Sequence, residues 1–235
     1  MVDFVAAVAI DKTQPISEET EMIFSLRHEM TRLAILAKVS KEVYSNAEGN
    51  DKNKTFINIR QIKLKNLEGG NFYTSGRYHF ATTNAGIGTW SKLQSNELDF
   101  TTIMDLTPVK IHEADGSGTD YNSAEGVPGV RLTGTQTRSL LKANEFLFLI
   151  PAGSEGLMAE KAYVSITYDI VTEDAALEKG YVCTPATTYL YMPVGTLRPG
   201  TAHTYTILID VDKITMEASV RDWNVVSIPN GIDEP

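Results

Sequence analysis

Apolar and polar side chains alternate along two runs near the C-terminus. The apolar positions of the first run are Tyr205, Ile207, Ile209 and Val211, and those of the second are Ile214, Met216, Ala218 and Val220. A period of two places each set on one face of a strand, and the polar pair Asp212-Lys213 between the runs predicts a turn. The pattern therefore predicts an amphipathic β-hairpin. A sheet with one apolar face needs a second layer, which favours an all-β sandwich.

A third alternating run, residues 55–65, changes face partway along. Its apolar set moves from Ile57 and Ile59 to Ile62 and Leu64, a shift of three residues. An odd shift turns the following side chains to the other face of a regular strand, so one residue must be extra. The sequence predicts a β-bulge near Arg60-Gln61.

Residues 17–44 fit two periods. Ser17 followed by glutamates is typical of a helix N-terminus, and Ile23, Leu26, Met30, Leu33 and Ala37 form a helical stripe. However, Leu33, Ile35, Ala37 and Val39 also alternate as in a strand. Periodicity alone favours a helix, and strands remain the alternative.

The middle of the chain predicts short strands and long loops. Residues 69–134 are rich in Gly, Ser, Thr and Asn, and 115–129 is the longest candidate loop. Residues 184–199 contain three prolines and predict an extended connection with an edge strand around 189–192.

Composition excludes several classes of partner. The chain has 235 residues, enough for one large β domain or two small ones, and a formal net charge of −9. This charge argues against a nucleic-acid partner and against an anionic membrane surface. No run approaches the ~20 apolar residues of a membrane span, so we expect no direct membrane insertion of this chain. Cys183 is the single cysteine, which excludes an intramolecular disulfide.

No motif predicts catalysis, a cofactor or a metal. His28-Glu29 begins like a zinc protease motif, but Arg32 stands where the second His ligand would be. Asp115, Asp120 and Glu125 offer oxygens for calcium, but they do not follow the twelve-residue loop pattern, and a solvated acidic loop is the ordinary interpretation. We therefore predict a protein that is not an enzyme.

Aromatic residues gather in one glycine- and asparagine-rich region. They are Phe72, Tyr73, Tyr78, Phe80 and Trp90. Exposed rings stack on sugar faces, which would suit a glycan-binding tip, whereas buried rings fill sandwich cores and anchor loops. Both interpretations stay open.

The order of several strand patterns resembles the fimbrillins of Bacteroidetes, the Mfa-like pilus subunits and adhesins. The resemblance covers roughly residues 20–223. It rests on the stretches FSLRHEMTRL (24–33), IKLKNL (62–67), FLFLIP (146–151), the strand 163–171, and the closing hairpin from Gly200 through Tyr205-Thr206 to Ala218-Ser219-Val220 and Asp222-Trp223. Relatives often have Trp at the position of Leu197, and this chain would match the C-terminal half of a usual two-domain precursor. The resemblance favours strands over helix in residues 17–44.

The resemblance implies a fold and a function. The fold is a transthyretin-like antiparallel β-sandwich with long loops and little helix, in which residues 1–20 form an N-terminal strand and linker and residues 21–235 the fimbrillin-like C-terminal domain. The function is that of a fimbrial (pilus) subunit or tip adhesin, exported as a lipoprotein precursor to the outer-membrane-attached fimbrium. Its partners would be other fimbrial subunits and a host glycan or protein. The alternative is a monomeric secreted sandwich that binds carbohydrate or protein.

Fimbrillins assemble by β-strand donation, which nominates segments of this chain. The candidate donor or edge residues are Phe4, Val5, Val8 and Ile10 in the first strand and Val225, Val226 and Ile228 in the tail. Pro229 in the tail favours a tip or accessory subunit over a stem subunit. The structural signature residues are His28, Tyr205, Val220 and Trp223, and the last three are expected to fix the closing hairpin.

Overall fold

The structure is a computed structural model of the chain. It describes residues 3–7, 26–40, 54–66, 73–82, 88–94, 97–110, 121, 126–132, 135–151, 157–158, 162–174, 176–193, 195–210 and 213–222. All regular elements in these ranges are strands, and none of the described segments forms a helix that could cross a membrane. The all-β class predicted from the sequence is confirmed.

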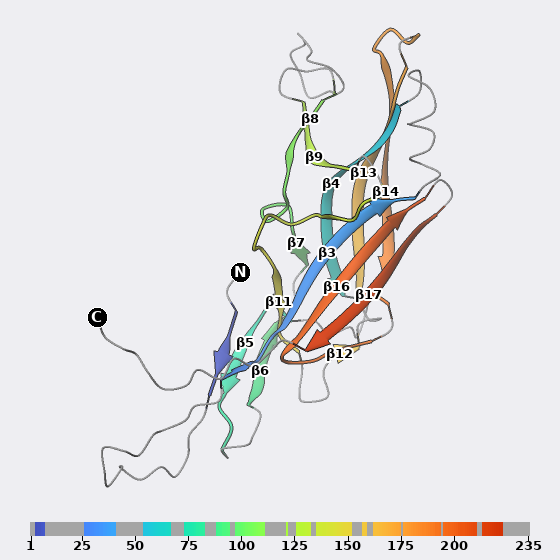
Figure 1. Ribbon diagram of the computed structural model, residues 1–235. Coiled ribbons are helices and arrows are strands. Elements are labelled where there is room, and N and C mark those ends of the chain that lie inside the picture. Colours follow the sequence, from blue (N-terminus) through green and yellow to red (C-terminus); the bar gives the residue numbers. More distant parts are fainter. Residues whose placement is uncertain are drawn as a thin grey trace, which may run out of the picture.

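Two sheets form a sandwich (Figure 1). The first has the order β10 (Arg138–Ser139), β3 (Thr31–Val39), β16 (Thr201–Ile209) and β17 (Ile214–Asp222), and β11 (Leu147–Leu149) also pairs with β3. The second has the order β14 (Tyr181–Tyr191), β13 (Ala162–Glu173), β4 (Lys54–Asn66), β9 (Val127–Leu132) and β8 (Thr107–Val109), and β7 (Leu98–Asp99) also pairs with β4. Strands β3 and β16 are parallel, and every other described pair is antiparallel.

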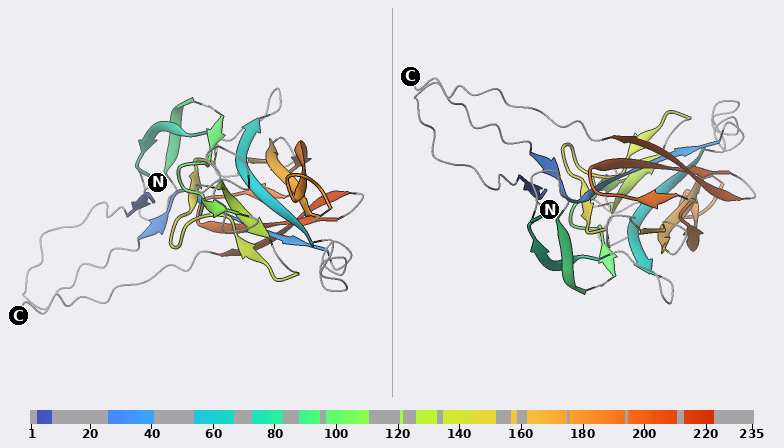
Figure 2. Two further views of the ribbon diagram at one scale, coloured as in Figure 1. Left: turned by 90° about the horizontal axis from the view of Figure 1, so that it is seen from above. Right: turned by 90° about the horizontal axis from the view of Figure 1, so that it is seen from below.

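Three two-stranded ribbons accompany the sandwich. They are β1 (Val5–Ala6) with β2 (Arg27–His28), β5 (Ser75–His79) with β6 (Thr89–Gln94), and β12 (Leu157–Met158) with β15 (Thr196–Leu197). The hairpin β5–β6 lies beside the N-terminal strand, apart from the strands of the two main sheets (Figure 2).

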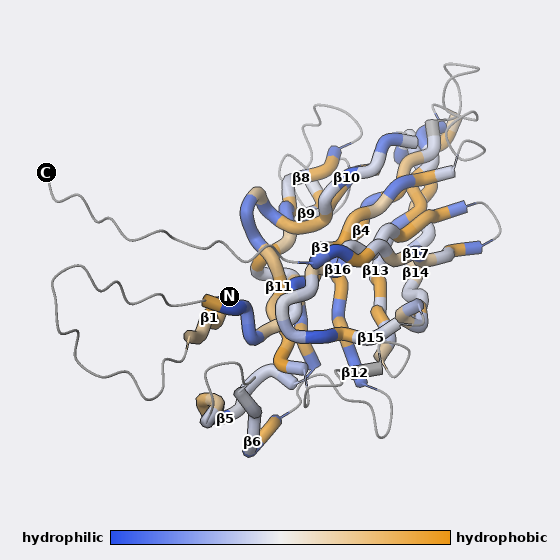
Figure 3. Tube along the Cα trace, turned by 60° about the horizontal axis from the view of Figure 1, so that its bottom comes forward, coloured by the Kyte–Doolittle hydropathy of each residue, from blue (hydrophilic) through white to orange (hydrophobic). Residues whose placement is uncertain are grey.

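Alternating side chains build the core between the sheets. Figure 3 shows hydrophobic and hydrophilic residues following one another along the strands. Every second residue of β3 is buried, from Thr31 to Val39, and β16 buries Tyr205, Ile207 and Ile209. The opposing sheet contributes Ile59, Ile62, Leu64, Val164 and Ile166. The predicted inward face of the first hairpin strand is therefore confirmed from Tyr205 to Ile209.

The helical interpretation of residues 17–44 is wrong where the structure describes them, because residues 27–28 and 31–39 are strands. Leu33 and Ala37 fit periods of two and of 3.6 alike, so they could not decide between helix and strand. Ile35 and Val39 decide it, since both are also buried. The strands implied by the fimbrillin resemblance are confirmed here.

The β-bulge predicted near Arg60-Gln61 is present in β4. Thr167 of β13 pairs with Gln61 and the next residue, Tyr168, pairs with Ile59, so Arg60 is the extra residue. Arg60 is exposed to solvent. The apolar residues before and after it, Ile59 and Ile62, both face the core. The bulge therefore lets Ile59 and Ile62 both enter the core.

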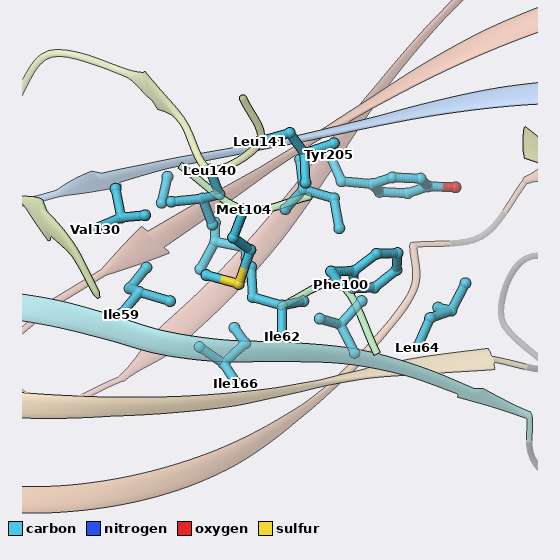
Figure 4. Packing of buried hydrophobic residues seen from close by; sticks show 14 of the residues in the cluster. Ile59, Ile62, Leu64, Phe100, Met104, Val130, Leu140, Leu141, Ile166 and Tyr205 are labelled. Carbon is cyan, nitrogen blue, oxygen red and sulfur yellow. The ribbon is translucent and has the colours of Figure 1, made fainter. Parts of the chain in front are cut away.

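One side of the sandwich is closed by the backbone. The Phe100 N–H donates to the Ile62 carbonyl over 3.0 Å, and Met104 forms a bridge with Leu141. The Leu140 N–H in turn donates to the Ile35 carbonyl over 3.0 Å. Figure 4 shows Phe100 and Met104 between Ile62 of one sheet and Tyr205 of the other. The backbone segments around Phe100–Met104 and Leu140–Leu141 therefore connect the six-stranded sheet to the five-stranded one.

Candidate functional site: open sheet edges and exposed aromatic surfaces

The opposite side of the sandwich carries two open strand edges. Within the described residues, β14 pairs with β13 alone and β17 pairs with β16 alone. The two strands approach each other along the same side of the molecule (Figure 1). Each edge offers a row of backbone N–H and C=O groups to which another strand can bond.

The edge strands are long and partly apolar. β14 has 11 residues and β17 has 9. Exposed apolar side chains lie on them, at Val182, Tyr189, Tyr191 and Val220. β14 was predicted as an extended connection with a short edge strand; the strand is longer than predicted and includes Pro185, a residue that edge strands tolerate. Long exposed edges of this kind are typical sites of strand addition.

The predicted first donor strand is paired within its own chain. Val5 pairs with His28 and Ala6 with Arg27, and the Glu29 N–H donates to the Phe4 carbonyl over 3.0 Å. Phe4 is half-buried and Val5 is exposed. Val8, Ile10, Val225, Val226, Ile228 and Trp223 lie outside the described residues, as do Phe72 and the acidic loop residues Asp115, Asp120 and Glu125.

The structure brings three of the five predicted aromatic residues together and adds Phe4. The Tyr78 ring centroid lies 5.1 Å from that of Trp90 and 5.3 Å from that of Phe80. The Phe4 ring packs edge-on against Tyr78 at 4.9 Å and against Trp90 at 5.5 Å. Phe80 is 60% exposed. Tyr73 lies elsewhere, in a bridge with Ile150.

Glu29 joins this cluster to the first strand. Its side chain is buried and hydrogen-bonded to the Tyr78 hydroxyl, and its carbonyl accepts a hydrogen bond from Trp90 Nε1 over 3.3 Å. Burial raises the pKa of the Glu29 carboxyl above its usual value, against the lowering effects of Tyr78 and Arg27. Burial and the Glu29 charge raise the pKa of the Tyr78 hydroxyl. Folding therefore shifts the titration of both groups toward their uncharged forms.

The signature residues have different surroundings. Tyr205 is 2% exposed within the core. His28 is half-buried, with Nδ1 2.6 Å from Oδ2 of Asp3, so it helps to hold the N-terminal strand. Val220 pairs with His203 in the hairpin and is 57% exposed. Leu197, where relatives often have Trp, is 1% exposed.

Sequence reasoning missed a buried polar cluster on the outer face of the six-stranded sheet. The Tyr121 hydroxyl donates to Oδ2 of Asp169 over 2.6 Å and accepts from Nδ2 of Asn58 over 2.9 Å. Its ring packs edge-on against Phe56 and Tyr181. Tyr121 sits in the predicted 115–129 loop, where no periodicity could show that it returns to the sheet. The cluster anchors Tyr121 to β4 and β13.

The described residues hold no group of three or more His, Cys, Asp or Glu side chains suited to a metal ion. His79 bonds to Ser91, and burial lowers the pKa of His203. Cys183 is a half-buried free thiol whose pKa is raised by burial. His79, His203 and Cys183 therefore lie in separate surroundings and do not form a common site.

The chain is similar in structure to solved proteins, although no sequence comparison finds a match. No family model matches the chain, and no curated protein matches it. A crystal structure of a fimbrial protein from Bacteroides vulgatus aligns over 86% of this chain with a TM-score of 0.60 and 23% identity. A putative cell adhesion protein from Parabacteroides distasonis aligns over the same share with a TM-score of 0.43 and 8% identity.

Only the Bacteroides vulgatus protein of these two supports a conclusion about the fold, because its TM-score exceeds 0.5. The chain spans 56% of the length of the Bacteroides vulgatus protein. At this identity the match concerns the fold. The chain therefore shares the fold of a fimbrial protein, as its resemblance to the fimbrillins implies.

Proposed function

We propose that the chain is part of a non-enzymatic, exported fimbrial subunit or tip adhesin that assembles by β-strand donation. The observation that carries this proposal is the presence of two open edges, β14 and β17, on one side of the sandwich, opposite a side that the backbone closes. An added strand forms backbone hydrogen bonds along such an edge and places alternate side chains into the pockets beside it.

The partner is then another fimbrial subunit that presents an extended segment. Half-buried apolar residues lie on both edge strands and would contact the side chains of an added strand. These are Ala186 and Leu190 of β14 and Ile214 and Met216 of β17. Similarity in fold to a fimbrial protein supports the same assignment. Attachment at the outer membrane through a lipoprotein precursor is part of the proposal and comes from the resemblance of the sequence to the fimbrillins.

The test is polymerisation of the full-length precursor. The precursor is treated with protease and run on denaturing gels without boiling. A ladder of heat-sensitive multimers is expected, and deletion of residues 224–235 should abolish it if the tail is the donor. Alanine at Phe4 and Val5 tests the first strand in the same assay. A single monomer band from the wild type after complete processing overturns strand donation.

The second candidate is a monomeric secreted module that binds carbohydrate or protein. The exposed Phe80 ring beside Tyr78 favours it, because exposed aromatic rings stack on sugars and on partner side chains. Phe80→Ala would then weaken adhesion of the monomer while leaving any multimer ladder unchanged.

A further inference from the structure

The outer face of the six-stranded sheet is divided into two halves by the bulge at Arg60. On one half, Tyr121 covers Phe56 and Val171 and bonds to Asp169, which forms a small second core. On the other half, the described residues include no element that covers the sheet. That half consists of three rows of paired outward residues from β14, β13 and β4: Tyr191, Tyr163 and Lys65; Tyr189, Ser165 and Lys63; Thr187, Thr167 and Gln61.

Tyrosine dominates this uncovered half, which we call the tyrosine face. Tyr189 is 61% exposed and Tyr191 is 68% exposed, and they lie two residues apart on β14, so their rings project to the same side. Tyr163 is the cross-strand partner of Tyr191, and its ring packs edge-on against Tyr189 with 5.7 Å between centroids. Edge-on packing is a favourable arrangement of aromatic rings, and here it places the two rings side by side.

The residues around the rings are polar, and their charges cancel. Lys63 Nζ lies 2.8 Å from a Glu97 carboxylate oxygen and 3.7 Å from one of Asp99, and Lys65 pairs with Glu97. Two lysines thus face two carboxylates. Gln61 donates to Asp99 over 2.9 Å, and the Thr167 and Thr187 hydroxyls lie 3.3 Å apart. The three rows contain no aliphatic side chain.

We propose that the tyrosine face binds a neutral oligosaccharide. A sugar ring presents an apolar C–H face that stacks on a tyrosine ring and a rim of hydroxyls that bond to amide, hydroxyl and charged side chains. The cancelled charges of the lysines and carboxylates disfavour an ionic ligand, and the chain's net charge of −9 disfavours an anionic one. The charged side chains around the rings, Lys63, Lys65 and Glu97, disfavour a protein partner, because charged residues are depleted from the cores of protein interfaces.

This inference goes beyond strand donation because it uses the face of the sheet and leaves the backbone edges of β14 and β17 untouched. The two proposals therefore fail separately. A chain that never polymerises can still bind sugar through these rings, and a polymerising subunit can lack the binding.

The test is titration calorimetry of the full chain with three neutral probes, cellohexaose, xylohexaose and mannohexaose, at up to about 10 mM. We expect at least one probe to bind, and Tyr189→Ala and Tyr191→Ala each to weaken that binding at least tenfold. Val182→Ala is the matched control, because Val182 is an exposed β14 residue outside the three rows, and it should leave the affinity unchanged. Urea unfolding of each variant checks that the fold is intact.

Four results would overturn the proposal. The first is no binding of any neutral probe, and the second is binding that both tyrosine variants retain. The third is a dimer of the wild type in sedimentation experiments that Tyr189→Ala or Tyr191→Ala dissociates, since the face would then contact a second copy of the chain. Binding of a sulfated glycan alone, with chondroitin sulfate as the probe, would equally exclude a neutral ligand.

Discussion

The Tyr121 hydroxyl donates a hydrogen bond to Oδ2 of Asp169 over 2.6 Å, which ties Tyr121 to the centre of a sheet. Asp169 is 2% exposed, and its charged neighbour Arg60 lies at 3.5 Å. A buried carboxylate is costly without a donor, so the Tyr121 hydroxyl stabilises the position of Asp169 in the sheet.

Tyr121→Phe tests that relationship. The substitution keeps the ring packing and removes one donor to Asp169 and one acceptor for Asn58, so we expect the free energy of unfolding to fall by about 1–3 kcal/mol. Urea unfolding measures it. Tyr189→Phe is the control, because Tyr189 is 61% exposed, and it should change stability by less than about 0.5 kcal/mol. Equal effects of the two variants would contradict the role of the Tyr121–Asp169 bond.

Glu29 should make stability depend on pH. Its carboxyl pKa is raised in the folded state, so the folded protein binds more protons than the unfolded one above the unfolded-state pKa. The contribution of Glu29 is therefore fully present below that pKa and is lost as the pH rises through the folded-state value. Glu29→Gln should stabilise the protein relative to wild type at pH 7 and lose this advantage in acid.

The measurement is urea unfolding of both proteins from pH 3 to pH 8. Glu217→Gln, at an exposed position of β17, serves as the control and should track the wild type. A stability difference between Glu29→Gln and wild type that stays constant across this range would show that the Glu29 carboxyl does not titrate differently on folding.

Deletion of Arg60 tests the bulge. Removing this residue lets Ile59 and Gln61 follow each other with regular alternation and keeps every inward side chain in place, so the protein should fold with a loss of about 0.5–3 kcal/mol. Deletion of Lys63 is the matched contrast, because it turns one part of β4 over and forces apolar residues outward. Soluble expression and cooperative unfolding of both deletions decide the matter; equal tolerance would contradict the observed register.

Tyr205 and Val220 separate two roles within the closing hairpin. Tyr205→Ala empties a fully buried site and should cost about 3–5 kcal/mol in thermal or urea unfolding. Val220→Ala alters a side chain that is 57% exposed and should cost less than about 0.5 kcal/mol. A large loss at Val220 would mean that this residue is covered in the folded protein.

The sequence predicts those features that depend on local periodicity. The β16 face from Tyr205 to Ile209 follows from alternation, and the bulge at Arg60 follows from one change of phase. The clustering of Tyr78, Phe80 and Trp90 follows from their nearness in sequence.

Features that depend on long-range contacts were beyond prediction from the sequence. The contacts of Phe4 with Trp90 and of Tyr121 with Asp169 join segments far apart in the chain, and no repeat or motif marks them. The outward direction of Tyr189 and Tyr191 also depends on the register of β14 against β13, which a segment with three prolines did not reveal.

Hydrogen exchange measured by mass spectrometry on monomer and assembled multimer tests the central proposal most directly. Strand donation predicts that backbone amides of β14 and β17 exchange quickly in the monomer and become protected in the multimer, while those of β13 and β4 are protected in both. Multimers in which β14 and β17 gain no protection would contradict assembly through these open edges.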